Sequence, residues 1–533
     1  MSDDLFRQFV GPIASLDCSR FGALPGFFSL DGSFFAQLDG ALVASRQATL
    51  STDWSEGGAT QDANEWWRLI GALAHDVLRE VDASRVVSVA ITGQYGSVVA
   101  VDEFGVALAP CVMWMDDRGS RAVRARVGGR AMGYAPRAAL TMVRRSGGAP
   151  SLNGTDGAGG LLYLWHEQSD LVDRAVWLLE PVDYLVMRFC AKASTTASTM
   201  LSWWLTDNRH PERHVYDEKL LALLGVDAEK FAPLVAFGSI AGEVSVRAHR
   251  ATGLPEGIPV LAGMTDLHAA ALGAGTTTVG GPAHLALSST SWISAPVTKK
   301  KTDVRHAIAT TPGLDESSYL IVNSQDAGAK AFEWSARALG GAATDLDELL
   351  VEAASAAPGS GQVIFSPWLL GERSPVDRHD ARAGFHHLSL QTTRAELLRA
   401  TLEGVAFNSR WLLHYVEKFA GGAFSSLRLL GGGANSNLWC QIMADVTRCS
   451  VDQLSNPSLS QLQGCALAAG RTLGVVTSNE IPSLTRVAQR FEPRDYLQSR
   501  YDTLYEEFSR LMASQSGMFR RLRDASSSSD DVF

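Results

Sequence analysis

The sequence lacks any uninterrupted apolar segment of about 18 residues or more, the length typical of a membrane-spanning helix. It also lacks, near Met1, the basic region followed by an apolar core that marks a signal peptide. Positive charge is in deficit, because 47 Lys and Arg stand against 57 Asp and Glu. An acidic chain binds nucleic acid and anionic membranes poorly. We therefore expect a cytoplasmic protein with neither a nucleic-acid nor a membrane partner.

Cysteine is scarce and widely spaced, with six in 533 residues. No C-x-x-C pair occurs and no cysteine has a histidine at ligand spacing, which argues against a zinc site and a disulfide framework. We expect reduced thiols at Cys18, Cys111, Cys190, Cys440, Cys449 and Cys465.

Hydrophobic residues make up 46% of the chain, and 533 residues exceed what one core usually supports. We therefore expect two large domains, over residues 10–254 and 255–480, and a helical extension over 481–523. The end of the chain, residues 524–533, holds four serines and three aspartates and is expected to be disordered.

Both halves begin with short strands followed by a helix, an order that predicts an α/β fold with an antiparallel edge. Asp31-Gly32 and Asp39-Gly40 are strong hairpin signals between apolar segments. We expect strands at 13–16, 26–30, 34–38, 41–45, 86–92, 259–262, 283–287 and 292–295, and helices at 63–81 and 267–273. Further helices are expected after the capping box of Thr393 and Glu396, from Ser436, and over 460–469.

One carboxylate, Asp266, stands alone in the small and apolar segment 259–275. Its position at a junction between a strand and a helix is where α/β sheets bind ligands. A carboxylate with apolar neighbours has a raised pKa and can accept a proton from a substrate hydroxyl. The alternative is a helix N-cap, since Asp is a preferred cap residue.

Other segments carry polar groups that suit ligand binding. The glycine triplet 431–433, followed by Asn435, fits either a close approach to a nucleotide or a tight turn. The hydroxyl-rich segment 288–291 fits either a phosphate cradle or an ordinary surface hairpin. Gln94 and the segment 114–118, with Asp116, Asp117 and Arg118, fit either a sugar site or a surface salt bridge. The loop 371–375 carries opposed charges and fits either a phosphate site or a closing turn.

The order of these motifs resembles the FGGY carbohydrate kinases, and among them is most similar to the xylulokinase branch. The resemblance extends over roughly residues 13 to 475. The matching segments are Trp54-Ser-Glu with Gln61-Asp62 and Trp66-Trp67, Gly93-Gln94, Trp114-x-Asp116-x-Arg118, Asp183-Tyr184-Leu185, Gly263-x-x-Asp266, Ser289-Thr290-Ser291, Gly371-Glu-Arg-Ser-Pro375, and Leu402-Glu-Gly404 before Gly431-Gly-Gly-Ala-Asn435.

The resemblance implies two actin-like, ribonuclease-H-like domains around a cleft, with ATP and Mg²⁺ as cofactors and a sugar or polyol as substrate. It implies phosphoryl transfer, in which positioning and charge neutralisation dominate, with Asp266 as the general base. Closure of the two lobes would exclude water. A homodimer is compatible with these expectations. The implied contacts are Gln94, Tyr95, Asp116 and Arg118 with the sugar, Ser19, Ser289, Thr290, Gly432, Gly433 and Asn435 with the nucleotide, and Asp17 with the metal.

The chain also departs from the family pattern. The opening Asp-x-Gly-Thr motif is Asp17-Cys-Ser-Arg20, and Leu24 takes the place of a basic residue; a second register starts at Asp31 but needs a deletion. The second phosphate turn has Ser289 where the family has glycine. At the sugar site, Gly-Gln-Met-His-Gly becomes residues 93–97, Gly-Gln-Tyr-Gly-Ser.

These departures leave three hypotheses. The first is an ATP-dependent sugar or polyol kinase, which predicts ADP release with some ketopentose, ketohexose or polyol. The second is a catalytically impaired homologue, a sensor or scaffold that binds ligand without turnover. The third is an actin-like ATPase whose hydrolysis no sugar affects.

Overall fold

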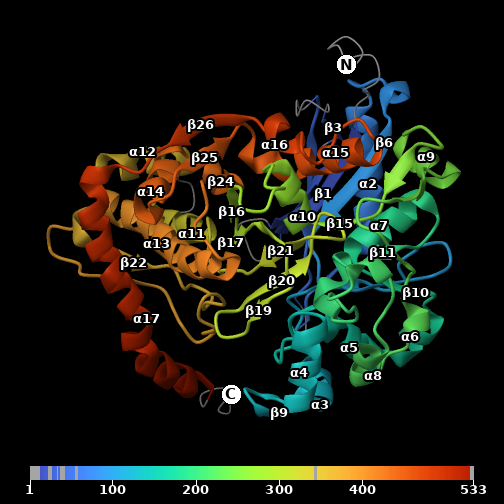
Figure 1. Cartoon of the computed structure of the whole chain (residues 1–533), viewed down its shortest axis with the longest axis horizontal. Helices are drawn as coiled ribbons and strands as arrows, with labels where there is room; N and C mark the ends of the chain where they lie inside the picture. The colour runs from blue at the N-terminus through green and yellow to red at the C-terminus, as the bar shows by residue number, and fades with distance from the viewer. Residues whose placement is uncertain are drawn as a thin grey trace.

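The computed structural model describes residues 13–21, 27–32, 34–36, 43–54, 58–340 and 345–527, with side chains from residue 43 to residue 525 of these ranges. Figure 1 shows two halves side by side, the blue-to-green first part of the chain and the yellow-to-red second part. Each half is built on its own sheet, and we call the two halves the first and second lobes. None of the described helices is long and apolar enough to cross a membrane.

The first lobe is built on a mixed sheet with the strand order β13-β14-β6-β1-β2-β4, in which β3 also pairs with β1 and β15 with β6. β1 and β15 run parallel to β6, whereas β2 runs antiparallel to β1 and forms the expected antiparallel edge. These strands are β1 (Ile13–Phe21), β2 (Phe27–Gly32), β3 (Phe34–Ala36), β4 (Arg46–Ser51), β6 (Ser88–Gly93), β13 (Ile240–Glu243), β14 (Pro259–Leu261) and β15 (Met264–Thr265).

Helices and short strands surround this sheet, and they contribute the apolar cores of the first lobe. They are β5 (Thr60–Gln61), α2 (Ala63–Val77), β7 (Val99–Val101), β8 (Cys111–Val112), α3 (Ser120–Val127), β9 (Gly128–Ala131), α4 (Pro136–Arg145), α5 (Gly157–Glu167), α6 (Ser169–Arg174), β10 (Trp177–Leu179), α7 (Pro181–Cys190), β11 (Thr195–Thr196), α8 (Glu218–Leu224), β12 (Leu234–Val235) and α9 (Val246–Thr252).

The second lobe combines a five-stranded sheet, β17-β16-β24-β25-β26, with a four-stranded sheet, β18-β21-β20-β19, and the pair β22-β23. The strands are β16 (Ala283–Leu287), β17 (Ser291–Ser294), β18 (Pro296–Val297), β19 (Thr302–Asp303), β20 (Ile308–Pro312), β21 (Tyr319–Val322), β22 (Ile364–Ser366), β23 (Gly384–His386), β24 (Leu427–Leu430), β25 (Val451–Leu454) and β26 (Val487–Phe491). The helices are α11 (Lys330–Gly340), α12 (Leu346–Ser355), α13 (Arg394–Ala420), α14 (Asn437–Thr447), α15 (Ser460–Thr472), α16 (Ile481–Leu484) and α17 (Gln498–Ser527).

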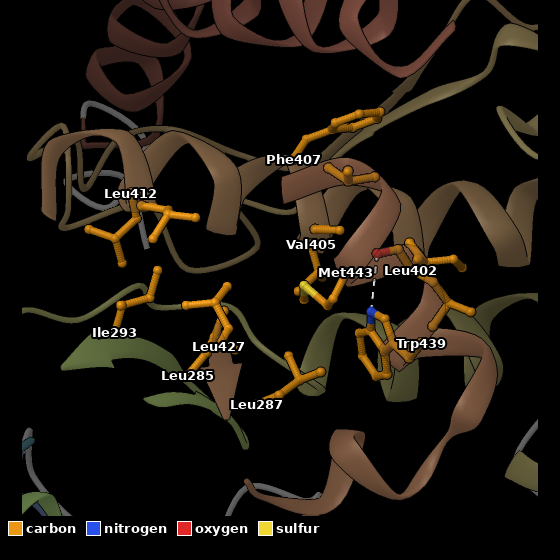
Figure 2. Packing of buried hydrophobic residues seen from close by; sticks show 14 of the residues in the cluster. Leu285, Leu287, Ile293, Leu402, Val405, Phe407, Leu412, Leu427, Trp439 and Met443 are labelled. Carbon is orange, nitrogen blue, oxygen red and sulfur yellow. Dashed lines mark hydrogen bonds between the residues drawn. The ribbon is translucent and has the colours of Figure 1, made fainter. Parts of the chain in front are cut away.

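α13 is the central helix of the second lobe, and its predicted capping box is confirmed: Thr393 and Glu396 bond each other's backbone N–H groups. The apolar face of α13 packs over β16, β17 and β24 (Figure 2). Trp439 of α14 closes this core from the side and donates from Nε1 to the carbonyl oxygen of Leu402 at 3.1 Å.

The two lobes meet at α10 (Asp266–Gly273), which follows β15, and α15. α15 belongs to the second half of the sequence, yet it packs on β1 and β6 of the first sheet and crosses α10. The crossing is very close, because a Cβ on Gly464 would lie 1.9 Å from the carbonyl oxygen of Ala269, and one on Gly273 would lie 1.7 Å from that of Ser460. Only glycine allows backbones to approach in this way.

Several boundary predictions for the first strands are wrong. Asp31-Gly32 is not a hairpin turn, because β2 continues through Gly32 and both β2 and β3 pair with the same strand, β1. The strand predicted at 41–45 lies later in the chain, as β4, because β2 pairs only with residues 46–51. Asp39-Gly40 lies outside the described residues.

The predicted lobe boundary at 254/255 would divide the first sheet, since β14 and β15 both hydrogen-bond with β6. We therefore propose that the boundary follows α10. The expected helical extension 481–523 also contains β26, which pairs with β25 at the edge of the second sheet. The tail predicted to be disordered from residue 524 is helical through Ser527, and 528–533 lie outside the described residues.

Candidate active site

Asp266 is the first residue of α10 and lies where three parallel strands end. Asp17 of β1 and Met264 of β15 both pair with Thr92 of β6, so the carboxyl ends of these strands lie together at one edge of the sheet. Asp266 is half-buried, and its Oδ1 accepts the N–H of Leu267 at 2.7 Å. The N-cap of α10 is Thr265, so the interpretation of Asp266 as the N-cap is wrong by one residue.

The loop after β6 carries Gln94 and Tyr95 and is fixed by a buried carboxylate. Glu180 accepts the N–H of Gly96 at 2.9 Å and that of Ser97 at 3.3 Å. Burial raises the pKa of Glu180 well above its usual value. Gly96 has a φ of +93°, and a Cβ there would lie 3.0 Å from Ser202 Oγ, so this position requires glycine.

Tyr95 is half-buried in the loop after β6. Burial raises the pKa of its phenol, the charge of Asp266 raises it further, and the charge of Arg373 lowers it. A carboxylate of the first lobe and a guanidinium of the second therefore both influence the pKa of this phenol. It stays neutral at physiological pH and can donate a hydrogen bond from its hydroxyl group.

Asp116 and Arg118 form a salt bridge, as one of the two sequence interpretations predicted, but the carboxylate is buried rather than on the surface. Asp116 Oδ2 lies 2.6 Å from an Arg118 Nη atom and also accepts the N–H of Ala59 at 2.9 Å. The Arg118 guanidinium lies over the ring of Tyr163 at 4.3 Å. Asp116 therefore orients Arg118, while Gln94 nearby is held by the indole N–H of Trp114 at 3.1 Å.

In the second lobe, the two predicted nucleotide turns lie next to each other because β16 and β24 are parallel neighbours. A Cβ on Gly431 would lie 2.5 Å from Ser288 Oγ. In the described part of the chain, the N–H groups of Ser289 and Thr290 donate to no protein acceptor. Asn435 donates from Nδ2 to the carbonyl oxygen of Gly432 at 3.1 Å and to Ser458 Oγ at 2.8 Å, which closes the glycine turn.

The loop 371–375 carries a further set of charged side chains. Arg373 pairs with Asp326 at 3.1 Å, and Glu372 accepts the N–H groups of Arg373 and Asp326 at 2.8 and 3.3 Å. Burial raises the pKa of Glu372 to about 8. Sequence reasoning missed Asp326 and Glu180; the position of Asp326 shortly after β21 was the available signal for the first.

Asp17 and Ser19, the expected metal and phosphate residues, both lie in β1. Their side chains lie outside the described residues. Asp17 and Asp31, the two candidate starts of the first motif, are paired across β1 and β2, so both registers place an aspartate on the same hairpin. Among the side chains that the structure describes, no group of three His, Cys, Asp or Glu could hold a metal ion.

Comparisons with known proteins give a consistent result. A xylulose kinase from Staphylococcus epidermidis is 24% identical over 472 residues, covering 85% of this chain and 88% of that protein. A xylulose kinase from Streptomyces coelicolor is 28% identical over 459 residues, covering 84% and 86%. An autoinducer-2 kinase from Enterobacter sp. is 25% identical over 491 residues, covering 88% and 89%.

Among solved structures, gluconate kinase and ligand-bound xylulose kinase from Lactobacillus acidophilus each superpose with a TM-score of 0.83 at 18% identity. They cover 96% of this chain and 100% and 99% of theirs. The fold is therefore the expected pair of actin-like, ribonuclease-H-like domains.

Two family models match most of the chain. The N-terminal domain of the FGGY family of carbohydrate kinases matches residues 35–273, and the C-terminal domain of the same family matches residues 284–473. The gap between these matches, 274–283, follows α10 directly. The chain belongs to the FGGY family of carbohydrate kinases.

Proposed function

We propose that this protein transfers the terminal phosphoryl group of ATP to a hydroxyl group of a sugar or polyol, a pentulose such as xylulose or a related ketose or polyol. Asp266 acts as the general base. The observation that carries the proposal is its place at the shared end of β1, β6 and β15, with Tyr95 close enough for the charges of Asp266 and Arg373 to change its pKa.

A base in this position accepts the proton of the attacking hydroxyl as the bond to phosphorus forms. The N–H of Leu267, which Asp266 accepts at 2.7 Å, and the N-terminus of α10 favour the ionised carboxylate that a base requires. Arg373 belongs to the second lobe. Its guanidinium supplies positive charge on the side of the site where negative charge develops in the transition state.

Two turns of the second lobe are suited to the nucleotide. Ser289 and Thr290 present main-chain N–H groups and hydroxyl groups at a half-buried turn, which are donors of the kind that phosphate oxygens accept. The exposed Gly432 leaves room for a planar base beside β24, because a Cβ there would meet nothing within 4 Å. Asn435 keeps that turn closed.

Mg²⁺ neutralises phosphate charge in phosphoryl transfer and prefers oxygen ligands, often one or two carboxylates together with phosphates and water. Asp17, on the strand that pairs with β6 next to the site, fits this chemistry. We propose that Asp17 holds the metal and that Ser19 contributes to the phosphate site.

The substrate side consists of Gln94, Tyr95 and the pair Asp116–Arg118. The family pattern Met-His at the ligand-facing pair is Tyr95-Gly96 here, so one imidazole is lost and a phenol is gained. This change favours an acceptor whose hydroxyl groups differ in placement from those of D-xylulose, within the same class of ketoses and polyols.

The test is ADP release from the purified protein with ATP, Mg²⁺ and a panel of ketopentoses, ketohexoses and polyols. We expect at least one acceptor to raise turnover, and Asp266→Asn to lower kcat by about 10²- to 10⁴-fold. Asp117→Asn, at an exposed carboxylate in the neighbouring segment, serves as the matched control and should leave kcat unchanged.

The same assay separates the other hypotheses. Ligand binding by calorimetry without ADP release would indicate a catalytically impaired homologue. ATP hydrolysis that no sugar changes would indicate an ATPase. Unaltered turnover in Asp266→Asn would falsify the role of Asp266.

A further inference from the structure

His268 lies two residues after Asp266 on α10 and is completely buried. Both ring nitrogens have partners: Nδ1 lies 2.7 Å from Thr265 Oγ1, and Nε2 lies 2.8 Å from the carbonyl oxygen of Pro312. A carbonyl oxygen can only accept, so Nε2 carries the proton, and Nδ1 accepts from the Thr265 hydroxyl group. Burial lowers the pKa of His268 to about 4, so this neutral tautomer persists at physiological pH.

The two hydrogen bonds of His268 join different lobes. Thr265 is the N-cap of α10 and pairs with Gly93 of the first sheet. Pro312 is the last residue of β20 in the second lobe. The imidazole therefore connects the start of the helix that carries Asp266 with a strand of the opposite lobe.

Packing already joins α10 to the second half of the chain, through its close crossing with α15 and a shared apolar core that includes Leu267, Leu314 and Leu320. A groove of about 470 Å³ is lined by residues from both lobes, among them Phe237 and Pro312, which both contact the buried His268. The ring of Phe237 lies 5.0 Å from the imidazole, so the first lobe contacts His268 from one side. A hydrogen bond depends strongly on distance and angle, so the His268–Pro312 bond adds a directional constraint to this packing.

We propose that His268 is a positioning residue, which holds Asp266 in register with the second lobe, from which ATP and Arg373 approach. The inference rests on the proposed role of Asp266. α10 already packs against α15 of the second half of the chain, and the His268–Pro312 bond adds a tie to β20 two residues after the base. This bond restrains the distance between the base and the phosphoryl group when the lobes move.

Two variants separate the two hydrogen bonds. In His268→Gln the side-chain amide reaches the position of Nε2 and can still donate to Pro312. In His268→Asn the shorter side chain keeps an acceptor near the position of Nδ1 and loses Pro312. Thr472→Val is the matched control. It removes a different hydrogen bond between the lobes, which Thr472 Oγ1 of α15 donates to the carbonyl oxygen of Gly238 at 2.6 Å.

We expect kcat of His268→Asn to fall by about 10- to 100-fold, because a displaced catalytic group costs this much, with KM for ATP and for the acceptor unchanged. His268→Gln should stay within about 3-fold of the natural protein. Thr472→Val should lower Tm as His268→Asn does and keep kcat. The acceptor is the member of the panel above with the highest turnover.

Equal kcat in His268→Gln and His268→Asn, or an equal loss in Thr472→Val, would overturn the proposal. If His268→Asn fails to fold, Thr265→Val is the second variant to measure. It removes the donor to Nδ1 and frees the ring to turn, so full kcat in this variant also counts against the proposal.

A readout without catalysis keeps this inference distinct from the proposed function. Amide hydrogen exchange of residues 264–273 in the ligand-free protein should be faster in His268→Asn than in His268→Gln. If no acceptor is turned over, the proposed function fails, and this exchange difference still decides whether His268 ties α10 to the second lobe. Equal exchange in the two variants contradicts it.

Discussion

Buried carboxyl groups hold several loops of the first lobe, among them the loop of the candidate site. Glu180 fixes the loop of Tyr95, and Asp156 caps α5 while it accepts the indole N–H of Trp204 at 3.0 Å. Asp183 accepts the hydroxyl groups of Thr195 and Thr199, and a Cβ on Gly263 would lie 3.0 Å from its Oδ1. Burial raises the pKa of Asp156 to about 6 and that of Asp183 to about 7.

Asp183 makes the stability of the protein depend on pH. Its pKa is about 7 in the folded protein and 3.8 without the fold. Between these values the folded state holds a proton that the unfolded state has released, so the contribution of Asp183 to stability falls as pH rises and levels off above about pH 7. Asp183→Asn removes this titration.

The measurement is urea unfolding of both proteins from pH 4 to pH 8. The fall in unfolding free energy between pH 4 and pH 7 should be smaller in Asp183→Asn, whatever its absolute stability. Parallel curves would show that Asp183 does not titrate in this range.

At the scale of elements, the three glycines of the turn after β24 differ in the space around them. Gly431 has a φ of +93° and touches the hairpin after β16, and a Cβ on Gly433 would lie 2.6 Å from Leu287 Cγ. Gly432 lies between them with open space around its Cα. Only the middle glycine can gain a side chain without moving the protein.

Gly432→Val should therefore raise KM for ATP by about 10-fold or more, which corresponds to about 1.4 kcal/mol of binding, while Tm and KM for the acceptor stay nearly constant. Gly433→Ala is the contrasting variant and should lower Tm, because Leu287 must shift. Steady-state kinetics and thermal unfolding measure both. An unchanged KM for ATP in Gly432→Val would place the adenosine elsewhere.

At the scale of the whole molecule, the second lobe depends on the C-terminal helix α17, which runs along its outer side (Figure 1). Tyr501 of α17 donates to the buried Glu403 at 2.8 Å, and Glu403 also pairs with Arg399 at 2.8 Å. Phe508 is fully buried in the same core. α17 lies beyond the matched family domain, which ends at residue 473.

Truncation after Phe491 should therefore destabilise the second lobe severely, because it exposes this core and leaves the charges of Arg399 and Glu403 without Tyr501. Truncation after Arg523 should be tolerated, because the residues it removes lie at the exposed end of α17 or beyond it. The measurement is the soluble yield and Tm of the two truncated proteins, compared with those of the full chain. A protein ending at Phe491 with unchanged Tm would show that α17 is dispensable.

Local signals in the sequence determined several elements and the place of the candidate base. The capping box of Thr393, the strand Ala283–Leu287 and the turn before α14 all depend on residues close together in the chain, so spacing alone predicts them. The same holds for Asp266 at the junction of a strand and a helix. The ordered motifs also predicted the family and the two-domain fold.

Only the tertiary structure decided which charged and polar groups lie around Asp266. Asp266 and Arg373, whose charges influence the pKa of Tyr95, are far from it in the sequence, as is Pro312 from His268, so no local spacing encodes these pairings. Sheet membership also supports the proposed lobe boundary after α10, because β14 and β15 pair with β6 of the first sheet. The sequence by itself thus determined which groups are available and where each element begins, whereas packing between distant elements decided which groups act together.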